Sequence, residues 1–243
     1  MLLQACLNGG CHRETHPRCP ITPTEVSADA IAAIAAGAEV VHVHPRDRDG
    51  NETLGADDVA QTITTLRETV DVPIGVTTGA WIIGDVAERL QAIAEWRALP
   101  DFASVNFHEE GAAAVASALL DRNVGVEVGV INAGAAEALV ASGLAERCVR
   151  VLIEPVEPTT DEALATVDAI ERVLDAGAPD VPRLLHGREA TAWDLVAEAG
   201  RRGYDTRIGM EDTIRMPDGK IAPGNGDLVR AALAHYREAE LSV

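Results

Sequence analysis

The sequence predicts a (β/α)8 TIM barrel, an α/β fold, from three observations. Short segments rich in β-branched and other apolar residues alternate with longer Ala-, Leu- and Glu-rich segments of helical period. The alternation repeats at roughly 30 residues, the length of one strand–helix unit, to the end of the chain. Barrels of this kind run to ~200–250 residues as one unit, and this chain has 243 residues. Since no linker, low-complexity tract or charge block divides it, we expect a single TIM-barrel domain over residues 1–243.

Each repeat contains one expected strand and one expected helix. The strands are expected at 2–7, 39–44, 73–77, 102–107, 124–128, 148–153, 182–186 and 205–210. The first helix is expected to begin near Thr24, after a Thr cap, and to close at Gly37. The later helices are expected near 56–69, 84–97, 110–122, 133–144, 160–176, 189–202 and 225–239. A doubly wound open sheet is the main alternative, but LNGGCHR after the first strand lacks the G-x-G-x-x-G pattern of its phosphate turn.

Composition excludes several classes of protein. The chain is 47% hydrophobic, enough for a large core, but only 3% aromatic, so the core must consist of Ala, Val, Leu and Ile. It has 39 acidic and 20 basic side chains and a formal net charge of −19, which disfavours nucleic acid and anionic membranes as partners. The four cysteines are too sparse for a disulfide framework. No signal peptide and no apolar run of ~18 residues is visible, so we expect a cytoplasmic protein with reduced thiols.

Two histidines mark the end of the second expected strand. His42 and His44 are two residues apart in VVHVHPRDRDG, so both side chains point to the same face of the strand. At a strand end of a barrel that face is the mouth, where active sites form. Two converging imidazoles suit Zn²⁺ or another divalent metal, although a hydrogen-bonded interior pair of histidines explains the motif equally well.

The last expected strand supplies a carboxylate on the same side of the barrel. In DTRIGMEDT, Arg207, Gly209 and Glu211 share one parity and Asp212 follows. A closed barrel brings the eighth strand beside the first and second, so Glu211 is expected to approach His42 and His44. Two His and one carboxylate with open positions form a catalytic type of metal site. A helix cap is the alternative, but the long segment up to residue 224 favours a functional loop.

The long connection after the first strand lies between these two segments. It carries polar side chains over the expected mouth, namely His12, Arg13, Glu14, His16 and Arg18. A structural zinc cluster of Cys11, His12, His16 and Cys19 is an alternative interpretation, but the spacing contains no C-x-x-C pair and one loop would supply every ligand.

Together these segments resemble one enzyme family. LNGG, AGAEVVHVHPRDRDG, VTTG and TRIGMEDT with DGKIAPGNGDLV are similar to the β-keto acid cleavage enzymes, known from 3-keto-5-aminohexanoate cleavage in lysine fermentation. The resemblance runs from about residue 5 to about residue 235. It implies a TIM-barrel transferase that uses a divalent metal, usually zinc, and acetyl-CoA as co-substrate. A β-keto acid and acetyl-CoA become acetoacetate and the CoA ester of the shortened acid. It also implies a homo-oligomer, with a tetramer favoured.

The resemblance also implies residue roles. The metal ligands would be His42, His44 and Glu211, and Asp212 assisted by Arg207 would be the general base. Further catalytic carboxylates would be Glu14 and Glu127. The stretches that hold substrate would contain Thr77, Thr78, Gly79, Ser104 and Asn106.

The chain departs from the family pattern after its fifth, sixth and seventh strands. Strand seven ends with His186, Arg188 and Glu189, which either bind an anionic substrate tail or cap the next helix. A phosphate-bearing ligand would need a local group of arginines, for which the candidates are Arg13, Arg18, Arg46, Arg48 and Arg188. A CoA-independent, metal-dependent aldolase or hydrolase acting on a small keto acid is the alternative function. A barrel that only binds or regulates is the non-enzymatic alternative.

Overall fold

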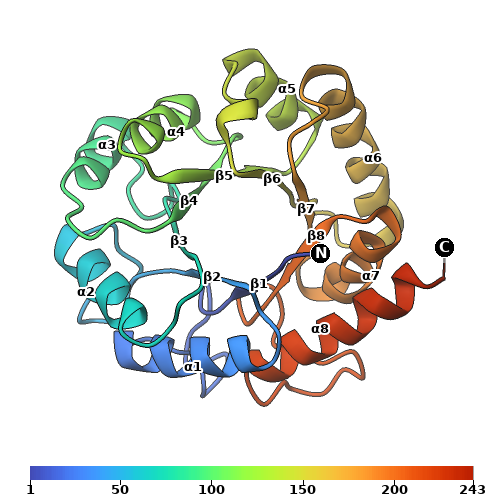
Figure 1. The fold of residues 1–243 in the computed structure, drawn as a ribbon, viewed down its shortest axis with the longest axis horizontal. Helices are drawn as coiled ribbons and strands as arrows, with labels where there is room; N and C mark the ends of the chain where they lie inside the picture. Colours follow the sequence, from blue (N-terminus) through green and yellow to red (C-terminus); the bar gives the residue numbers. More distant parts are fainter. Residues whose placement is uncertain (243) are drawn as a thin grey trace.

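The chain folds into a closed barrel of parallel strands surrounded by helices, seen along the barrel axis in Figure 1. The structure, a computed structural model, describes residues 1–242. Within these residues, neighbouring strands pair in sequence order and β8 closes against β1. The strands are β1 (Leu3–Cys6), β2 (Val40–Val43), β3 (Ile74–Thr77), β4 (Phe102–Asn106), β5 (Gly125–Val130), β6 (Arg150–Ile153), β7 (Arg183–Leu185) and β8 (Asp205–Ile208). The predicted (β/α)8 barrel is therefore confirmed, and the open-sheet alternative is excluded.

One helix follows each strand. They are α1 (Pro23–Ala35), α2 (Ala56–Arg67), α3 (Val86–Ala94), α4 (Ala112–Asp121), α5 (Ala133–Ser142), α6 (Thr160–Gly177), α7 (Ala192–Arg202) and α8 (Asn225–Glu240). The short 3-10 helices η1 (Ala145–Arg147) and η2 (Glu189–Thr191) precede β6 and α7.

Local chemistry explains where two helices depart from the predicted boundaries. α1 begins before Thr24, because Thr22 caps it in a capping box with Glu25 and Pro23 occupies the first turn. The helix expected from residue 189 begins at Ala192 instead. Glu189 adopts a left-handed conformation with φ 48°, which an α-helix cannot include. Residues 189–191 instead form the short 3-10 helix η2.

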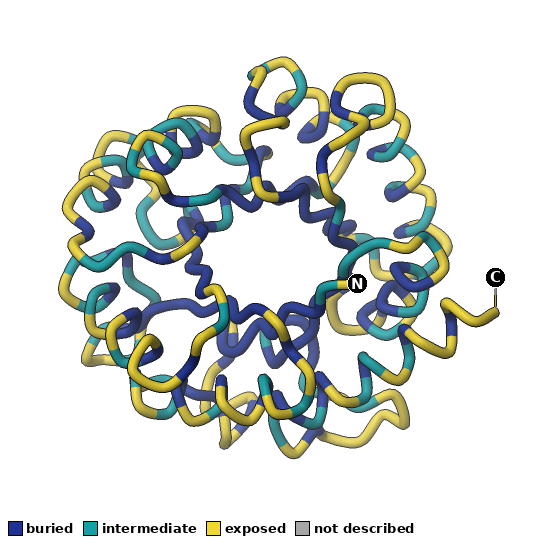
Figure 2. Tube along the Cα trace, viewed as in Figure 1, coloured by how far each residue is buried: buried dark blue, intermediate teal, exposed yellow. Residues whose placement is uncertain are grey.

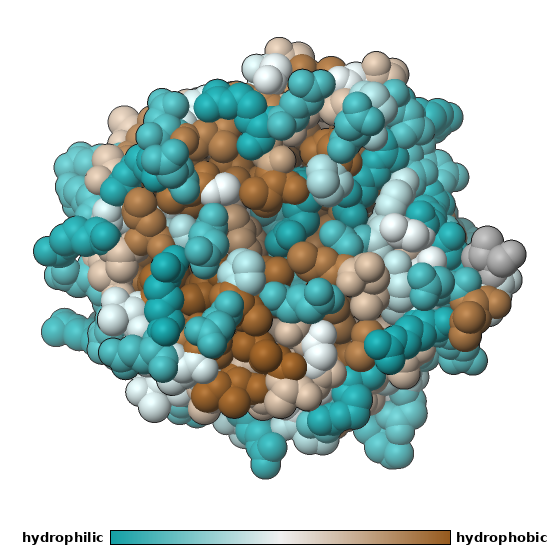
Figure 3. Space-filling model, in the orientation of Figure 1, coloured by the Kyte–Doolittle hydropathy of each residue, from teal (hydrophilic) through white to brown (hydrophobic). Residues whose placement is uncertain are grey.

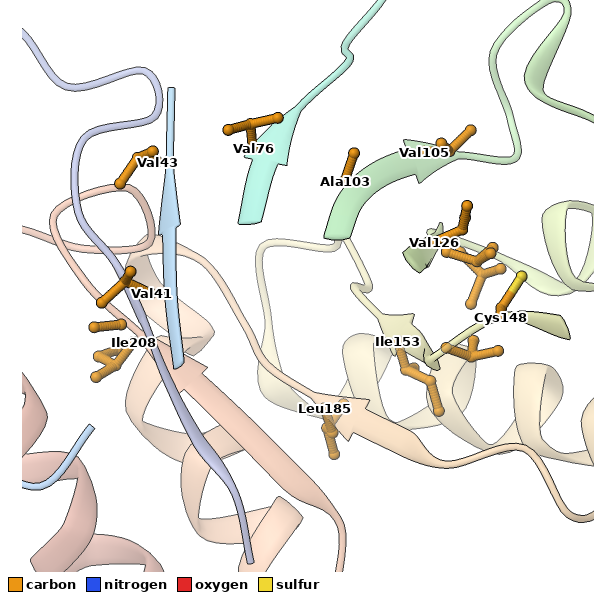
Figure 4. Close-up of a cluster of buried hydrophobic side chains, with 14 of the residues drawn as sticks. Val41, Val43, Val76, Ala103, Val105, Val126, Cys148, Ile153, Leu185 and Ile208 are labelled. Atoms are coloured by element: carbon orange, nitrogen blue, oxygen red, sulfur yellow. The ribbon is translucent and has the colours of Figure 1, made fainter. Parts of the chain in front are cut away.

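The two sides of the strands differ in chemistry. Outward-facing side chains such as Val41, Val76, Val126 and Leu185 are apolar and buried beneath the helices (Figure 4). The ring of strands is buried, and exposed residues are concentrated on the outer helix faces and loops (Figure 2). Hydrophilic residues cover much of the face shown in Figure 3, as the charge of −19 requires. No helix among residues 1–242 is both long and apolar enough to cross a membrane.

A polar cluster closes the barrel interior below the mouth. Glu127 Oε2 lies 2.5 Å from Arg150 Nε, and Arg150 also donates to Gln4 Oε1 at 2.6 Å. Gln4 Nε2 returns a hydrogen bond to Glu127 at 3.2 Å, and the Arg150 guanidinium lies 5.0 Å from the centroid of the Phe102 ring. Gly75 is required beside that ring, since a Cβ there would lie 2.2 Å from it. The site therefore has a fixed, charge-paired floor.

Candidate active site

The three predicted metal ligands converge at the carboxyl ends of neighbouring strands. His42 lies on β2 in register with Cys6 of β1, and β1 pairs on its other side with β8, whose chain continues to Glu211. Glu211 Oε2 lies 3.5 Å from His44 Nε2 and 3.9 Å from His42 Nε2. One ligand atom from each of the three residues lies within 4.8 Å of the others. Tetrahedral zinc with bonds of ~2.0–2.1 Å needs ligand atoms about 3.3 Å apart, which small side-chain movements would reach.

The immediate surroundings fit a divalent cation. Glu211 Oε2 is buried and has no hydrogen-bond partner, which is costly for a carboxylate oxygen unless a cation is bound. Gly9 lies against the ligands, since a Cβ there would be 2.5 Å from Glu211 Oε2 and 2.6 Å from His44 Nε2. The chain thus keeps a glycine where any side chain would fill the space at the ligand atoms.

A second carboxylate lies beside the His44 ring, on the side away from Glu211. Glu52 Oε1 lies 3.0 Å from His44 Nδ1, the ring nitrogen opposite the one that faces Glu211. The same Oε1 accepts the backbone N–H of Gly10 at 2.9 Å, and Oε2 accepts the indole N–H of Trp81 at 2.6 Å. The Trp81 ring also stacks on His44, with centroids 6.1 Å apart and planes at 22°. A carboxylate in this place fixes the ring orientation of a metal-binding histidine.

Glu52 and Trp81 are two residues of the site that the sequence did not predict. Asp47 and Gly50 form a turn after β2, and the returning chain pairs Arg46 with Glu52 in an antiparallel bridge. The signal was the DRDG turn itself, which places a residue soon after it back beside the end of the strand.

The charges of these groups are strongly coupled. Burial lowers the pKa of His42 to about 4, so its imidazole is neutral at pH 7. Burial acts in the same direction on His44, but the neighbouring carboxylates of Glu211 and Glu52 outweigh it and raise the pKa of His44 to about 9. Burial opposes ionisation of Glu211, yet the positive charges of Arg207 and His44 hold its pKa well below the usual range. A cation that binds His44 would therefore have to displace a proton from that ring.

The predicted base lies beside the ligands but deeper. Arg207 donates to Glu211 Oε1 at 2.9 Å and to Asp212 Oδ1 at 2.7 Å, so one guanidinium positions both carboxylates. Asp212 Oδ1 also lies 3.3 Å from His186 Nδ1, while Asp212 Oδ2 is buried without a partner. Asp212 is 0% exposed and does not itself line the cavity.

A cavity of about 630 Å³ opens over the site. Of the residues predicted to hold substrate, Thr77, Ser104 and Asn106 line it. The other two shape the loop after β3. Thr78 donates to the Ser104 carbonyl at 2.6 Å, and Gly79 leaves room for the Trp81 ring, which a Cβ would approach to 2.2 Å.

Two predicted catalytic carboxylates lie away from the cavity lining. Glu14 is exposed on the loop after β1. Glu127 belongs to the buried floor, because β5 continues to Val130 and places Glu127 in mid-strand instead of at the mouth. Burial alone would raise the pKa of Glu127, but the charge of Arg150 lowers it overall.

The five candidate arginines are not gathered into one group. Arg13 pairs with Glu25, Arg18 binds the Pro223 carbonyl, and Arg48 is exposed beside Asp49. Arg46 and Arg188 line the cavity. Arg46 is buried and donates to the carbonyls of Asn8, Cys11 and Gly50, so it ties the loops after β1 and β2 together.

The Cys and His residues of the first loop do not form a zinc cluster. His16 uses both ring nitrogens, one with the Ala222 carbonyl and one with the Arg18 N–H. Cys11 and Cys19 are buried, and His12 is exposed at the cavity. Among residues 1–242, the one group of His, Cys, Asp and Glu with metal-ligand geometry is His42, His44 and Glu211.

The fold and the cavity at the carboxyl ends of its strands are those of a TIM-barrel enzyme. The model of the beta-keto acid cleavage enzyme family matches residues 1–243, and the chain belongs to that family.

Relatives agree with this assignment. The chain is 26% identical over 249 aligned residues to the 3-keto-5-aminohexanoate cleavage enzyme of Fusobacterium nucleatum, covering 93% of this chain and 87% of the relative. It is 33% identical over 91 residues to the 3,5-dioxohexanoate:acetyl-CoA acetone transferase of Paraburkholderia graminis, covering 37% of this chain and 29% of the relative.

Solved structures share the fold. ObcA, in a ternary complex with a C4-CoA adduct and oxalate, matches with a TM-score of 0.68 and 19% identity, covering 93% of this chain and 64% of ObcA. The N-acetylmannosamine-6-phosphate 2-epimerase of Clostridium perfringens matches with a TM-score of 0.56 and 10% identity, covering 87% of each chain.

Proposed function

We propose that this protein is a zinc-dependent β-keto acid cleavage enzyme that condenses a β-keto acid with acetyl-CoA to give acetoacetate and the CoA ester of the shortened acid. The observation that carries the proposal is that His42, His44 and Glu211 are placed close enough together to bind one cation, in a chain of this family. The relative named as an acetyl-CoA transferase and the CoA adduct in the ObcA structure support the choice of co-substrate.

The proposed reaction balances without an external oxidant or reductant. The carbon between the keto and carboxylate groups loses a proton and forms a bond to the thioester carbonyl of acetyl-CoA, and the CoA thiolate leaves. The thiolate then attacks the original keto carbon. The bond between the keto carbon and the carbon that was acylated in the first step breaks. This leaves the CoA ester of the shortened acid, and the released carbanion takes the proton back to form acetoacetate.

The chain's own residues have distinct parts in this scheme. Zinc held by His42, His44 and Glu211 supplies Lewis-acid polarisation of the keto group. Arg207 holds Glu211 and Asp212 at fixed positions through its two hydrogen bonds. Asp212 is the proposed base, and its Oδ2 has no partner of its own. This atom lies behind the cavity wall formed by Arg207 and Glu211, so a small side-chain movement must expose it before it takes the proton of the reacting carbon and later returns it. Thr77, Ser104 and Asn106 offer hydrogen bonds to substrate oxygens from the cavity wall.

A CoA-independent, metal-dependent aldolase or hydrolase is the second candidate. The observation that favours it is the dispersal of Arg13, Arg18 and Arg48 into other contacts, which leaves only Arg46 and Arg188 of the five candidate arginines at the cavity. The two candidates differ in one measurable requirement, which is acetyl-CoA.

The test uses protein of measured zinc content with a panel of β-keto acids, assayed with and without acetyl-CoA. We expect acetoacetate only when zinc and acetyl-CoA are both present, and loss of zinc and activity in His42→Ala and Glu211→Ala. His235→Ala, a substitution of a histidine that packs against Trp193 outside the cavity, is the matched control. Turnover without CoA would favour the second candidate, and full activity in both ligand variants would refute the metal site.

A further inference from the structure

The charges of the cavity wall are confined to one side. The carboxylates and guanidinium groups in the lining lie on or after β2, β6, β7 and β8, the side of the barrel that also carries His42 and His44. These charged residues are Arg46, Glu52, Glu154, Arg188, Arg207 and Glu211.

The opposite side of the wall carries no charged side chain. From Thr77 on β3 to Leu152 on β6, none of the described lining residues is Asp, Glu, Lys or Arg. Thr77, Ser104 and Asn106 supply its small polar groups, and Ile82, Ile131 and Leu152 supply its apolar surface. We call these six residues the neutral arc. His108, also in this part of the lining, is exposed at the cavity entrance.

Two charged side chains next to the neutral arc, Glu154 and Glu109, are already paired with other groups of the protein. Glu154 Oε1 lies 3.4 Å from Arg188, and Glu154 Oε2 lies 3.6 Å from His186 Nε2. Behind Asn106, Glu109 pairs with the buried Arg89 at 2.9 Å and accepts a hydrogen bond from the Asn106 amide. Between Thr77 and Leu152, therefore, none of the described residues lining the cavity turns a carboxylate or guanidinium toward a ligand.

We propose that the neutral arc receives the part of the β-keto acid beyond its keto group, and that this part is uncharged and mainly aliphatic. The inference rests on the proposed function and specifies its substrate class. An ammonium group or a second carboxylate on this part of the substrate would lose its hydration on binding without gaining an oppositely charged partner from the protein. By contrast, each methylene placed in an apolar pocket favours binding, and one methylene changes kcat/KM by ~10–200-fold.

The test compares three β-keto acids of equal length. They are 3-ketohexanoate with a neutral chain, 3-keto-5-aminohexanoate with a cationic chain and 3-ketoadipate with an anionic chain. With zinc-loaded protein and acetyl-CoA, we expect kcat/KM for the neutral acid to exceed both others by about 100-fold. A charged acid within tenfold of the neutral one would overturn the inference while leaving the proposed function intact.

Failure of the proposed function has a different signature. If none of the three acids turns over, calorimetric binding to the zinc-loaded protein still ranks them. Tighter binding of 3-ketohexanoate supports the neutral arc, and equal or tighter binding of a charged acid overturns it.

A charge placed on the neutral arc should reverse the preference. Ile131→Asp is expected to lower kcat/KM for 3-ketohexanoate and to raise it for 3-keto-5-aminohexanoate. Val156→Asp lies outside the neutral arc, at the exposed rim of the cavity beyond its Leu152 end, and adds a carboxylate beside the arc with little risk to folding. Ile221→Asp, exposed and outside the cavity lining, is the matched control and should leave the ranking unchanged. An unchanged ranking in both cavity variants, shown folded by thermal melting, would contradict the proposal.

Discussion

Glu52→Gln tests how far the carboxylate behind His44 determines metal binding. Glu52 faces donors on every side, since its oxygens meet the His44 ring, the Gly10 N–H and the Trp81 indole N–H. A glutamine keeps one acceptor oxygen and replaces the other with an NH2 group. Whichever way the amide turns, the NH2 group faces a donor, so the orientation of His44 is less well defined.

The expected effect follows from two independent magnitudes. Removing an outer partner of a metal-binding histidine costs ~10–100-fold in metal affinity. Leaving one buried donor without an acceptor costs ~1–3 kcal/mol. Since about 1.4 kcal/mol changes an equilibrium constant tenfold, this cost corresponds to about the same 10–100-fold range of metal affinity. We therefore expect the zinc dissociation constant of Glu52→Gln to rise by about 10–100-fold.

The assay is competition with a chromophoric zinc chelator at fixed pH. Glu68→Gln, an exposed substitution on the far end of α2, is the control and should retain the wild-type affinity. An unchanged dissociation constant in a folded Glu52→Gln protein would show that Glu52 does not support the metal site.

Three further variants test other parts of the structure. Gly9→Ala should weaken zinc binding more than Glu52→Gln does, because its Cβ would lie 2.6 Å from His44 Nε2, and wild-type affinity by the same competition assay would contradict this. Arg150→Met should lower the free energy of unfolding in urea by about 3–5 kcal/mol by leaving the Glu127 carboxylate buried and unpaired. Adding Glu127→Leu to it should restore most of the loss, and no recovery would argue against a role for the pair. Asp29→Asn tests a carboxyl whose pKa is raised by burial from 3.8 to about 6. The folded state keeps this proton where the unfolded state has lost it, so stability falls as pH rises from about 4 to 6. The variant should therefore be more stable than wild type by about 3 kcal/mol at pH 7 and equal to it below pH 4, and a pH-independent difference would refute the assignment.

Much of the fold could be predicted because the alternation of the strands and the ~3.6-residue period of the helices are both plain in the sequence. Apolar residues alternate on the strands, and the outward-facing set, such as Val41, Val43 and Val76, is the part that the helices bury. The convergence of His42, His44 and Glu211 could be predicted for the same reason. His42 and His44 share a parity, and barrel closure brings Glu211 to them.

The parts that were missed depend on boundaries and loops. β5 extends two residues beyond its predicted end, and that extension places Glu127 in the floor instead of at the mouth. Glu52 and Trp81 reach His44 because two loops fold back over β2, and loop geometry is not encoded in periodicity. The dispersal of Arg13, Arg18 and Arg48 likewise depends on where each loop turns.

The central claim is that the protein cleaves β-keto acids through a divalent metal held by His42, His44 and Glu211. Its most direct test is a zinc titration of chelator-treated protein, followed by acetyl-CoA-dependent acetoacetate formation. We predict that activity rises in proportion to zinc, levels off at one equivalent per chain, and is absent in His42→Ala at every zinc level. Full activity in the metal-free protein, or an unchanged titration in His42→Ala, would contradict it.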